Sequence, residues 1–197
     1  MNKILFVIFT LFVSTLFAQQ ETLLRAGEIT HGGYGGPVVK FNNIKGEFGL
    51  LVGGRGAWVI NHSFGLGAGG YGLTNNIKTD IMINGKQRRI QFGYGGVFLE
   101  YVMNSHRMVH FTLSTLIGGG VVTLSDGDYL DNEGSFDNTS PFFALEPEAG
   151  IELNITTFFR INAGVSYLYI NGVDKFNLTG DDFSGPSAYL IFKFGKF

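Results

Sequence analysis

Residues 142–154 read FFALEPEAGIELN, and residues 158–170 read FFRINAGVSYLYI, with a turn of three residues between them. In both stretches, apolar residues alternate with charged, polar or glycine residues. Successive side chains of a β-strand point to opposite faces of a sheet, so this period of two predicts two amphipathic strands joined as a hairpin. Three glutamates share one face of the first strand: Glu146, Glu148 and Glu152.

The same alternation recurs along the rest of the chain. It predicts eight strands, at residues 29–41, 47–60, 63–74, 89–102, 108–123, 142–154, 158–170 and 186–197. Short turns alternate with long connections along the chain. The short turns are at 61–62, 103–107 and 155–157, and the long connections are at 75–88, 125–141 and 171–185. The hairpin at 42–46 is the one short connection at the end where the other connections are long. The three short turns at 61–62, 103–107 and 155–157 therefore lie at one end of the strands. Because the strand number is even, both ends of the mature chain lie there too.

Composition narrows the class of protein. The chain has 197 residues, no cysteine and a formal net charge of -2. Disulfides and thiolate metal sites are therefore excluded, and the charge does not suggest nucleic-acid binding. Hydrophobic residues make up 45% and charged residues 15%, against a usual charged share of roughly 25%. A chain this apolar and aromatic is not an intrinsically disordered segment.

The first eighteen residues differ from the rest. Lys3 is followed by the almost wholly apolar run 4–17, and Leu16-Phe17-Ala18 is similar to a signal-peptidase site. The run is shorter than the ~20 residues that a membrane helix needs. We therefore expect a cleaved signal peptide at 1–18 and one domain at 19–197, with an uncleaved anchor as the alternative.

Alternation alone does not say which strand face is inside. The polar face carries many glycines and few charges, whereas a water-facing sheet normally carries many charges. Phe, Tyr and Trp lie near the strand ends on the apolar face, as in an interfacial aromatic girdle. Mid-strand glycines such as those at 65–70 suit the interior of a narrow barrel. These features favour an apolar exterior in a membrane; a soluble periplasmic barrel with an apolar ligand inside is the alternative.

The signal peptide, the eight alternating strands and the terminal Phe197 together resemble the small outer-membrane proteins of the OmpA, OmpX and OmpW type. This resemblance implies an all-β, eight-stranded antiparallel up-and-down transmembrane barrel in the bacterial outer membrane. Phe197, with Tyr189 eight positions earlier, is similar to the signal that such proteins present to the barrel-assembly machinery. Lys193 and Gly195 depart from that pattern, and the alternation leaves the facing of the last strand open.

Charged side chains on the polar faces predict an ion-pair network in the lumen. Its expected members are Arg55, Glu100, His110, Glu146, Glu148, Glu152 and Arg160. If the hairpin turn at 155–157 is centred on Thr156, Glu152 lies opposite Arg160. If the turn at 103–107 is centred on Ser105, Glu100 lies opposite His110. Buried charges need partners, so we interpret the network as a structural plug, with a gated pore constriction as the alternative.

Two outer connections carry candidate ligand contacts. Lys86, Arg88 and Arg89 precede the fourth predicted strand at its outer end. They would lie at the depth of lipopolysaccharide phosphates, unless they simply form a solvated loop. Asp126, Asp128 and Asp131 crowd another outer connection; their spacing does not match an EF-hand, but they could bind divalent cations loosely.

The sequence does not favour catalysis. His62 and Ser63 are adjacent, so on a strand their side chains would point to opposite faces. A serine nucleophile and its histidine base must instead lie within hydrogen-bonding distance of each other. The Gly65–Gly70 stretch matches a dinucleotide-binding pattern but has no following helix. We expect no catalytic residues, cofactor or metal centre, and a structural or surface-interaction role in contact with outer-membrane lipid and lipopolysaccharide. A lipid A-modifying enzyme is the remaining alternative.

Overall fold

The computed structural model describes residues 29–83, 86–125, 139–175 and 177–197. Their order along the chain is β1 (His31–Ile44), β2 (Glu47–Ile60), β3 (Phe64–Leu73), β4 (Ile77–Ile83), β5 (Lys86–Met103), β6 (Val109–Ser125), β7 (Thr139–Asn154), β8 (Phe159–Asn171), the 3₁₀ turn η2 (Gly180–Asp182) and β9 (Gly185–Lys196). Within these residues no helix is long and apolar enough to cross a bilayer.

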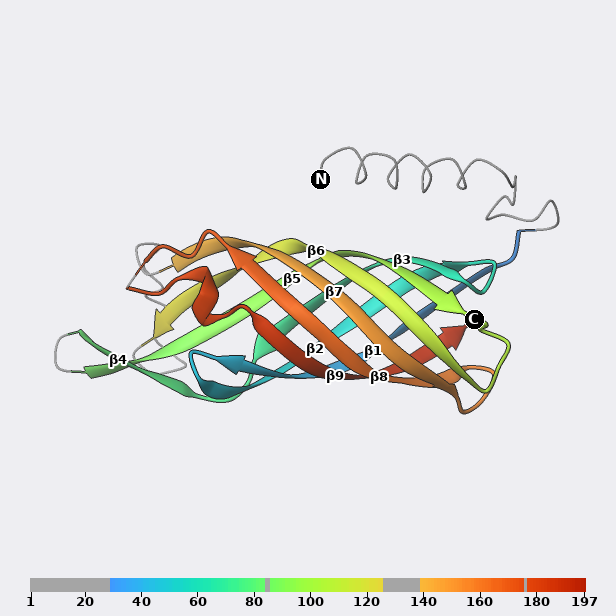
Figure 1. Cartoon of the computed structure of the whole chain (residues 1–197), viewed down its shortest axis with the longest axis horizontal. Helices are drawn as coiled ribbons and strands as arrows, with labels where there is room; N and C mark the ends of the chain where they lie inside the picture. Colours follow the sequence, from blue (N-terminus) through green and yellow to red (C-terminus); the bar gives the residue numbers. More distant parts are fainter. Residues whose placement is uncertain (1–28, 84–85, 126–138, 176) are drawn as a thin grey trace, which may run out of the picture.

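Eight of the strands close into a ring. The hydrogen-bonded order runs β3-β2-β1-β9-β8-β7-β6-β5, and β3 also pairs with β5, which closes the barrel. Every pairing is antiparallel. The all-β, eight-stranded antiparallel barrel predicted from the sequence is confirmed (Figure 1).

β4 was not predicted. It pairs only with the first residues of β5, from Ile77 opposite Ile90 to Ile83 opposite Lys86. The connection expected to be a loop at 75–88 thus contains a two-stranded arm that extends β5 beyond the ring (Figure 1). The sequence predicts a loop here, although the Ile-Lys-Thr-Asp-Ile-Met-Ile segment of β4 also alternates.

Three short turns lie together at one end of the barrel, whereas the short β1–β2 turn lies at the other end. The three turns connect β2 to β3, β5 to β6 and β7 to β8, and Figure 1 shows them beside the chain's C-terminus. Asn61, His62 and Asn104 have positive φ angles of 51°, 56° and 55°. Asparagine tolerates this left-handed conformation better than most residues do, which suits these positions to tight turns.

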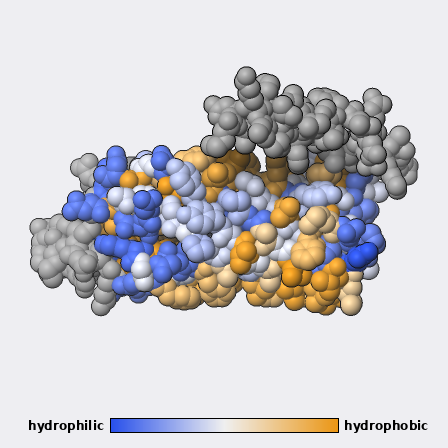
Figure 2. Space-filling view, viewed as in Figure 1, coloured by the Kyte–Doolittle hydropathy of each residue, from blue (hydrophilic) through white to orange (hydrophobic). Residues whose placement is uncertain are grey.

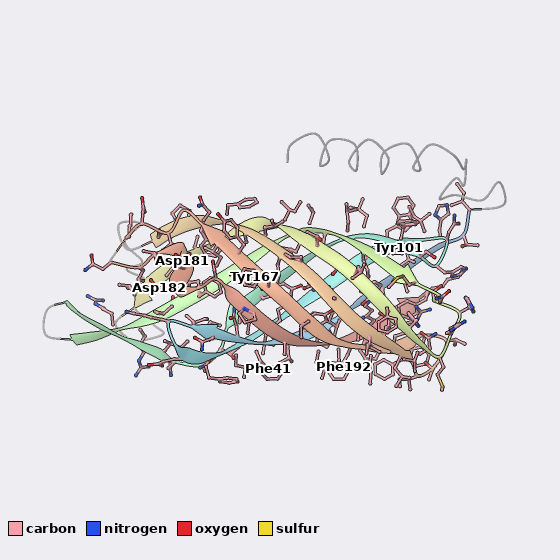
Figure 3. The ribbon with its side chains drawn as sticks, in the orientation of Figure 1. Phe41, Tyr101, Tyr167, Asp181, Asp182 and Phe192 are labelled. Carbon is pink, nitrogen blue, oxygen red and sulfur yellow. The ribbon has the colours of Figure 1, made fainter. Side chains whose placement is uncertain are left out.

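The barrel wall is apolar outside, whereas its interior combines charged and polar side chains with buried apolar ones. On β8, Val165 and Tyr167 are 63% and 52% exposed, whereas the intervening Ser166 is 6% exposed. Figure 2 shows hydrophobic side chains along much of the wall and hydrophilic ones gathered at the two ends. In Figure 3, Phe41 and Phe192 point away from the barrel axis. The outward facing of the apolar side chains, which the alternation left undecided, is that of a barrel surrounded by lipid.

Inward glycines keep the barrel narrow. A Cβ atom built on Gly36 would lie 1.7 Å from the carbonyl oxygen of Phe192, and one on Gly53 would lie 1.9 Å from that of Gly70. No side chain fits at such distances, so the strands approach this closely only because these residues are glycine.

Candidate functional site: the charged lumen

Four glutamates point into the barrel from two strands. Glu100 lies on β5, and Glu146, Glu148 and Glu152 lie on β7; none is more than 5% exposed. A carboxylate removed from water to this extent requires cationic partners and hydrogen-bond donors. Three of the partners, Lys40, Arg55 and Lys193, come from strands that do not neighbour those of their glutamates, so these charges join separate parts of the wall.

The first cluster surrounds Glu146 and Glu148. Lys40 Nζ on β1 lies 2.6 Å from Glu146 Oε2 and 2.8 Å from Glu148 Oε1. Arg55 on β2 donates to both oxygens of Glu148, from Nη1 at 2.8 Å and from Nη2 at 2.7 Å. This fork-to-fork geometry is the strongest arrangement of an arginine with a carboxylate.

Hydroxyl groups also donate to both carboxylates of this cluster. Glu146 accepts from the Tyr94 hydroxyl at 2.8 Å and from Ser166 at 2.7 Å, and Glu148 accepts from Ser114 at 2.5 Å. The Lys40 ammonium also lies 4.1 Å from the centre of the Tyr71 ring, within range of a cation–π interaction. The first cluster is therefore closely hydrogen-bonded on all sides.

The second cluster surrounds Glu152, nearer the short turns. One of its oxygens lies 3.1 Å from Arg160 Nη1 and 3.2 Å from His110 Nε2. The other lies 2.6 Å from Lys193 Nζ and accepts from Asn162 Nδ2 at 3.2 Å. Four side chains from β6, β8 and β9 thus converge on one carboxylate.

Lys193 links Glu152 to the fourth glutamate, because its ammonium also forms an ion pair with Glu100. Glu100 accepts a further hydrogen bond from the Tyr34 hydroxyl at 2.5 Å. The terminal residue covers this end of the network: the Phe197 ring lies 5.9 Å from the Tyr34 ring and 3.9 Å from the Arg160 guanidinium carbon.

An apolar layer fills the lumen at the opposite end. Phe92 on β5 stacks on Phe142 of β7 and on Phe183 of the β8–β9 connection, with ring centres 5.4 Å and 5.2 Å apart. Leu178 and Phe183, both from that connection, are 2% and 0% exposed. The described residues of this connection, 172–175 and 177–184, therefore fold into the mouth of the barrel at this end. We call these residues the lid.

All seven residues expected in the lumen do lie inside the barrel, but the predicted opposite pairs are wrong. Glu152 lies opposite Asn162, and it reaches Arg160 diagonally. Glu100 lies opposite Ser114, four residues beyond His110. His110 instead lies opposite Glu152 on β7.

Two lysines and several tyrosines of the network were missed. Lys40 lies between Val39 and Phe41, which belong to the apolar, outward face of the strand. Because successive side chains alternate, the sequence could have placed Lys40 in the lumen. Lys193 lies in the strand whose facing the alternation left open; the structure places it inside, 1% exposed. Inward tyrosines escaped notice because aromatic residues were assigned to the outer girdle.

The remaining predicted residues fall in different places. Tyr189, expected in the assembly signal, faces the lumen and is 4% exposed. Arg88 is buried on the inner side of β5, so the expected lipopolysaccharide contact is wrong for this residue, whereas Arg89 is partly exposed. The structure does not describe the side chain of Lys86. Asp126, Asp128 and Asp131, like the expected signal peptide, lie outside the described residues.

One of the described histidines, His110, belongs to the charged lumen. His110 contacts Glu152 and the carbonyl oxygen of Arg107. No histidine of the described part hydrogen-bonds a serine or threonine hydroxyl. Across those residues no group of three metal-binding side chains comes together either.

The chain is similar to known proteins in its fold and not in its sequence. No protein family and no curated protein matches the sequence. The crystal structure of Neisserial surface protein A superposes with a TM-score of 0.58 at 13% identity, over 87% of this chain and 100% of that one. This chain has the fold of a small eight-stranded outer-membrane β-barrel. Two further structures are similar: Ail, the attachment invasion locus protein of Yersinia pestis (TM-score 0.49, 15% identity, 84% of this chain and 97% of that one), and the outer membrane protein OprG from Pseudomonas aeruginosa (0.47, 12%, 84% and 93%).

Proposed function

We propose that this chain is an integral outer-membrane barrel with a structural or surface-interaction role, whose lumen is closed by its own side chains. The lipid-facing apolar wall supports membrane residence, because a soluble carrier of an apolar ligand would expose polar residues and keep an apolar cavity inside. Here the middle of the interior holds salt bridges.

The observation that carries the proposal is the pairing of every inward glutamate. The four carboxylates are matched by four cationic side chains: Lys40, Arg55, Arg160 and Lys193. Three of these pairs join strands that are not neighbours: Lys40 with Glu146, Arg55 with Glu148, and Lys193 with Glu100. The network therefore ties the barrel across its width, and the pair of Arg160 with Glu152 adds a contact within the β7–β8 hairpin. An ion pathway would instead need water-filled space between charges of one sign. The apolar layer beneath the lid adds a second closure.

The surface role falls to the outer end. The lid and the β4–β5 arm both lie on that side. Binding residues are commonly found on connections held by a rigid scaffold. The short turns at the other end leave little surface for recognition.

Export and assembly complete the proposal. A signal peptide at 1–18 would direct secretion, and the aromatic C-terminus at Phe197 would be read by the barrel-assembly machinery. In the folded barrel this ring packs on Tyr34 and Arg160, so recognition would precede closure of the lumen.

Fractionation of cells tests the membrane assignment. The mature chain should sediment with outer membranes, and it should migrate faster on gels when unheated, since a closed barrel has no free edge and resists detergent. Recovery from the soluble periplasmic fraction would overturn the proposal.

Planar-bilayer recording tests the closed lumen. The folded protein should give no stable conductance, because side chains fill an eight-stranded barrel. A steady open level on the scale of a general porin, in a preparation that shows the gel shift, would contradict closure while leaving the membrane assignment intact.

A further inference from the structure

The barrel wall has a notch where β3 leaves β5. The β3–β5 ladder ends at Gly72 opposite Gly93, and the β4–β5 ladder begins at Ile77 opposite Ile90. Gln91 and Phe92 therefore have no ladder partner on this side. The space between is a notch of about 270 Å³, close to the lower end of the ~300–1,000 Å³ typical of small-molecule sites.

Hydrogen bonds to β2 hold the chain away from β5 at this point. Thr74 N donates to the carbonyl oxygen of Leu50 at 2.8 Å, and Asn75 Oδ1 accepts from Leu50 N at 2.7 Å. Asn75 Nδ2 donates to the carbonyl oxygen of Phe48 at 2.7 Å. One wall of the notch is thus fixed by three hydrogen bonds, so the space is built into the fold.

The notch lies at the boundary between the apolar wall and the polar rim. On the outer face, Gln91 lies opposite Thr123, while the next outward pair toward the short turns is Gly93 opposite Val121. Two residues of a strand rise about 7 Å. A lipid headgroup at this polar row would therefore have apolar wall directly below it for its acyl chains.

Arg89 gives the notch its charge. It is partly exposed, lines the notch together with Gln91 and Thr123, and lies one outward position beyond Gln91. Among the described residues it has no ion-pair or hydrogen-bond partner. The guanidinium fork matches phosphate oxygens, and arginine keeps its charge at all relevant pH values.

We infer that this notch holds the phosphorylated headgroup of an outer-leaflet glycolipid, with Arg89 contacting the phosphate and with Gln91 and Thr123 hydrogen-bonding neighbouring hydroxyl groups. The inference rests on the proposed membrane location. It also replaces the broader expectation for residues 86–89, because the Arg88 side chain is buried. The acyl chains lie outside the notch, against Val121 and the wall below it.

Native mass spectrometry of the folded, detergent-solubilised chain tests this site. Bis-phosphorylated lipid A is titrated against wild type, Arg89→Gln, Arg89→Lys and Arg107→Gln, and the same lipid after dephosphorylation serves as a second probe. Arg107 is a matched control, because it is an exposed arginine in the β5–β6 turn at the opposite end. The unheated gel shift establishes that each variant is folded.

Arg89→Gln should weaken binding of the phosphorylated lipid at least about tenfold, the scale of one hydrogen bond between charged groups. Arg89→Lys should lie between wild type and Arg89→Gln, and Arg107→Gln should match wild type. Dephosphorylated lipid should bind wild type and Arg89→Gln equally weakly. Equal binding of the phosphorylated lipid by wild type and Arg89→Gln would overturn the site.

A competition experiment with inorganic phosphate separates a lipid headgroup from a free anion. Phosphate should displace the lipid only at far higher concentration, because it lacks the acyl chains. Displacement at comparable concentration would identify a free anion as the occupant and overturn the lipid assignment. If the barrel fractionates with membranes but Arg89→Gln binds the lipid as wild type does, the lipid site is wrong and the proposed function stands. If the chain is soluble, the proposed function is wrong as well.

Discussion

Glu152 on β7 and Arg160 on β8 form an ion pair of 3.1 Å although they are not register partners. Asn162 lies directly opposite Glu152, and Arg160 lies opposite Asn154. The pair is diagonal, which long side chains allow. It leaves Glu152 room to contact His110 and Lys193 as well, so one carboxylate holds together strands β6, β8 and β9.

Replacing this carboxylate should destabilise the barrel strongly. Glu152→Ala leaves buried cationic groups without their shared partner, and breaking a buried ion pair in this way costs about 3–5 kcal/mol. The measurement is the urea midpoint of the protein folded in lipid vesicles. Glu47→Ala is the control, because Glu47 is exposed at the start of β2 and should change the midpoint little. Equal midpoints for the two variants would remove Glu152 from any structural role.

Lys40 should show coupling to Glu146. It supplies the only cationic group within 4 Å of Glu146 among the described residues. Lys40→Met therefore leaves Glu146 buried without a counter-charge, and we expect a loss of about 3 kcal/mol or more in the free energy of unfolding. Lys196→Met, an exposed lysine at the end of β9, is the control.

A double variant separates this pairing from simple packing. Adding Glu146→Gln to Lys40→Met removes the stranded charge, so the double variant should be more stable than Lys40→Met alone. A coupling energy of roughly 0.5–3 kcal/mol is expected for residues in contact. Additive effects in the double-mutant cycle would show that the two side chains act independently.

The sequence could predict which residues face the lumen but not which ones meet there. Alternation assigns a side chain to a face, and a shift of register by two or four residues leaves every face unchanged. Glu100 was thus correctly placed inside but paired with His110, whereas the turn after Met103 puts Phe111 opposite that residue and Ser114 opposite Glu100. Contacts across the barrel, such as Lys40 with Glu146, depend on ring closure and leave no local signal.

Inward glycines should tolerate no side chain, and one glycine of the same wall offers a control. A Cβ on Gly53 would lie 1.9 Å from the carbonyl oxygen of Gly70 and 2.8 Å from the Cα of Tyr71, whereas one on Gly72 would meet nothing within 4 Å. Gly53→Ala requires β2 and β3 to separate, at a cost of about 1–3 kcal/mol for overpacking. Gly72→Ala should leave the urea midpoint within about 0.5 kcal/mol of wild type. Similar urea midpoints for Gly53→Ala and Gly72→Ala would show that β2 and β3 separate at Gly53 without a cost in stability.

Phe183 tests whether the lid and the ion pairs close the lumen separately. Its fully buried ring stacks on Phe92, so Phe183→Ala should loosen the lid and cost about 3–5 kcal/mol. Limited proteolysis should then cut within 172–184 faster than in wild type. Phe158→Ala is the control, because Phe158 is 59% exposed in the β7–β8 turn at the opposite end.

The same variant should still pass no ions. Loosening the lid leaves Lys40, Arg55 and their glutamates in place below it, and these paired side chains alone fill the narrow section. Planar-bilayer recordings of Phe183→Ala should therefore match wild type even when proteolysis shows an open lid. A steady conductance in Phe183→Ala that is absent from Phe158→Ala would show instead that the apolar layer is the gate and that the charged section beneath it is already permeable.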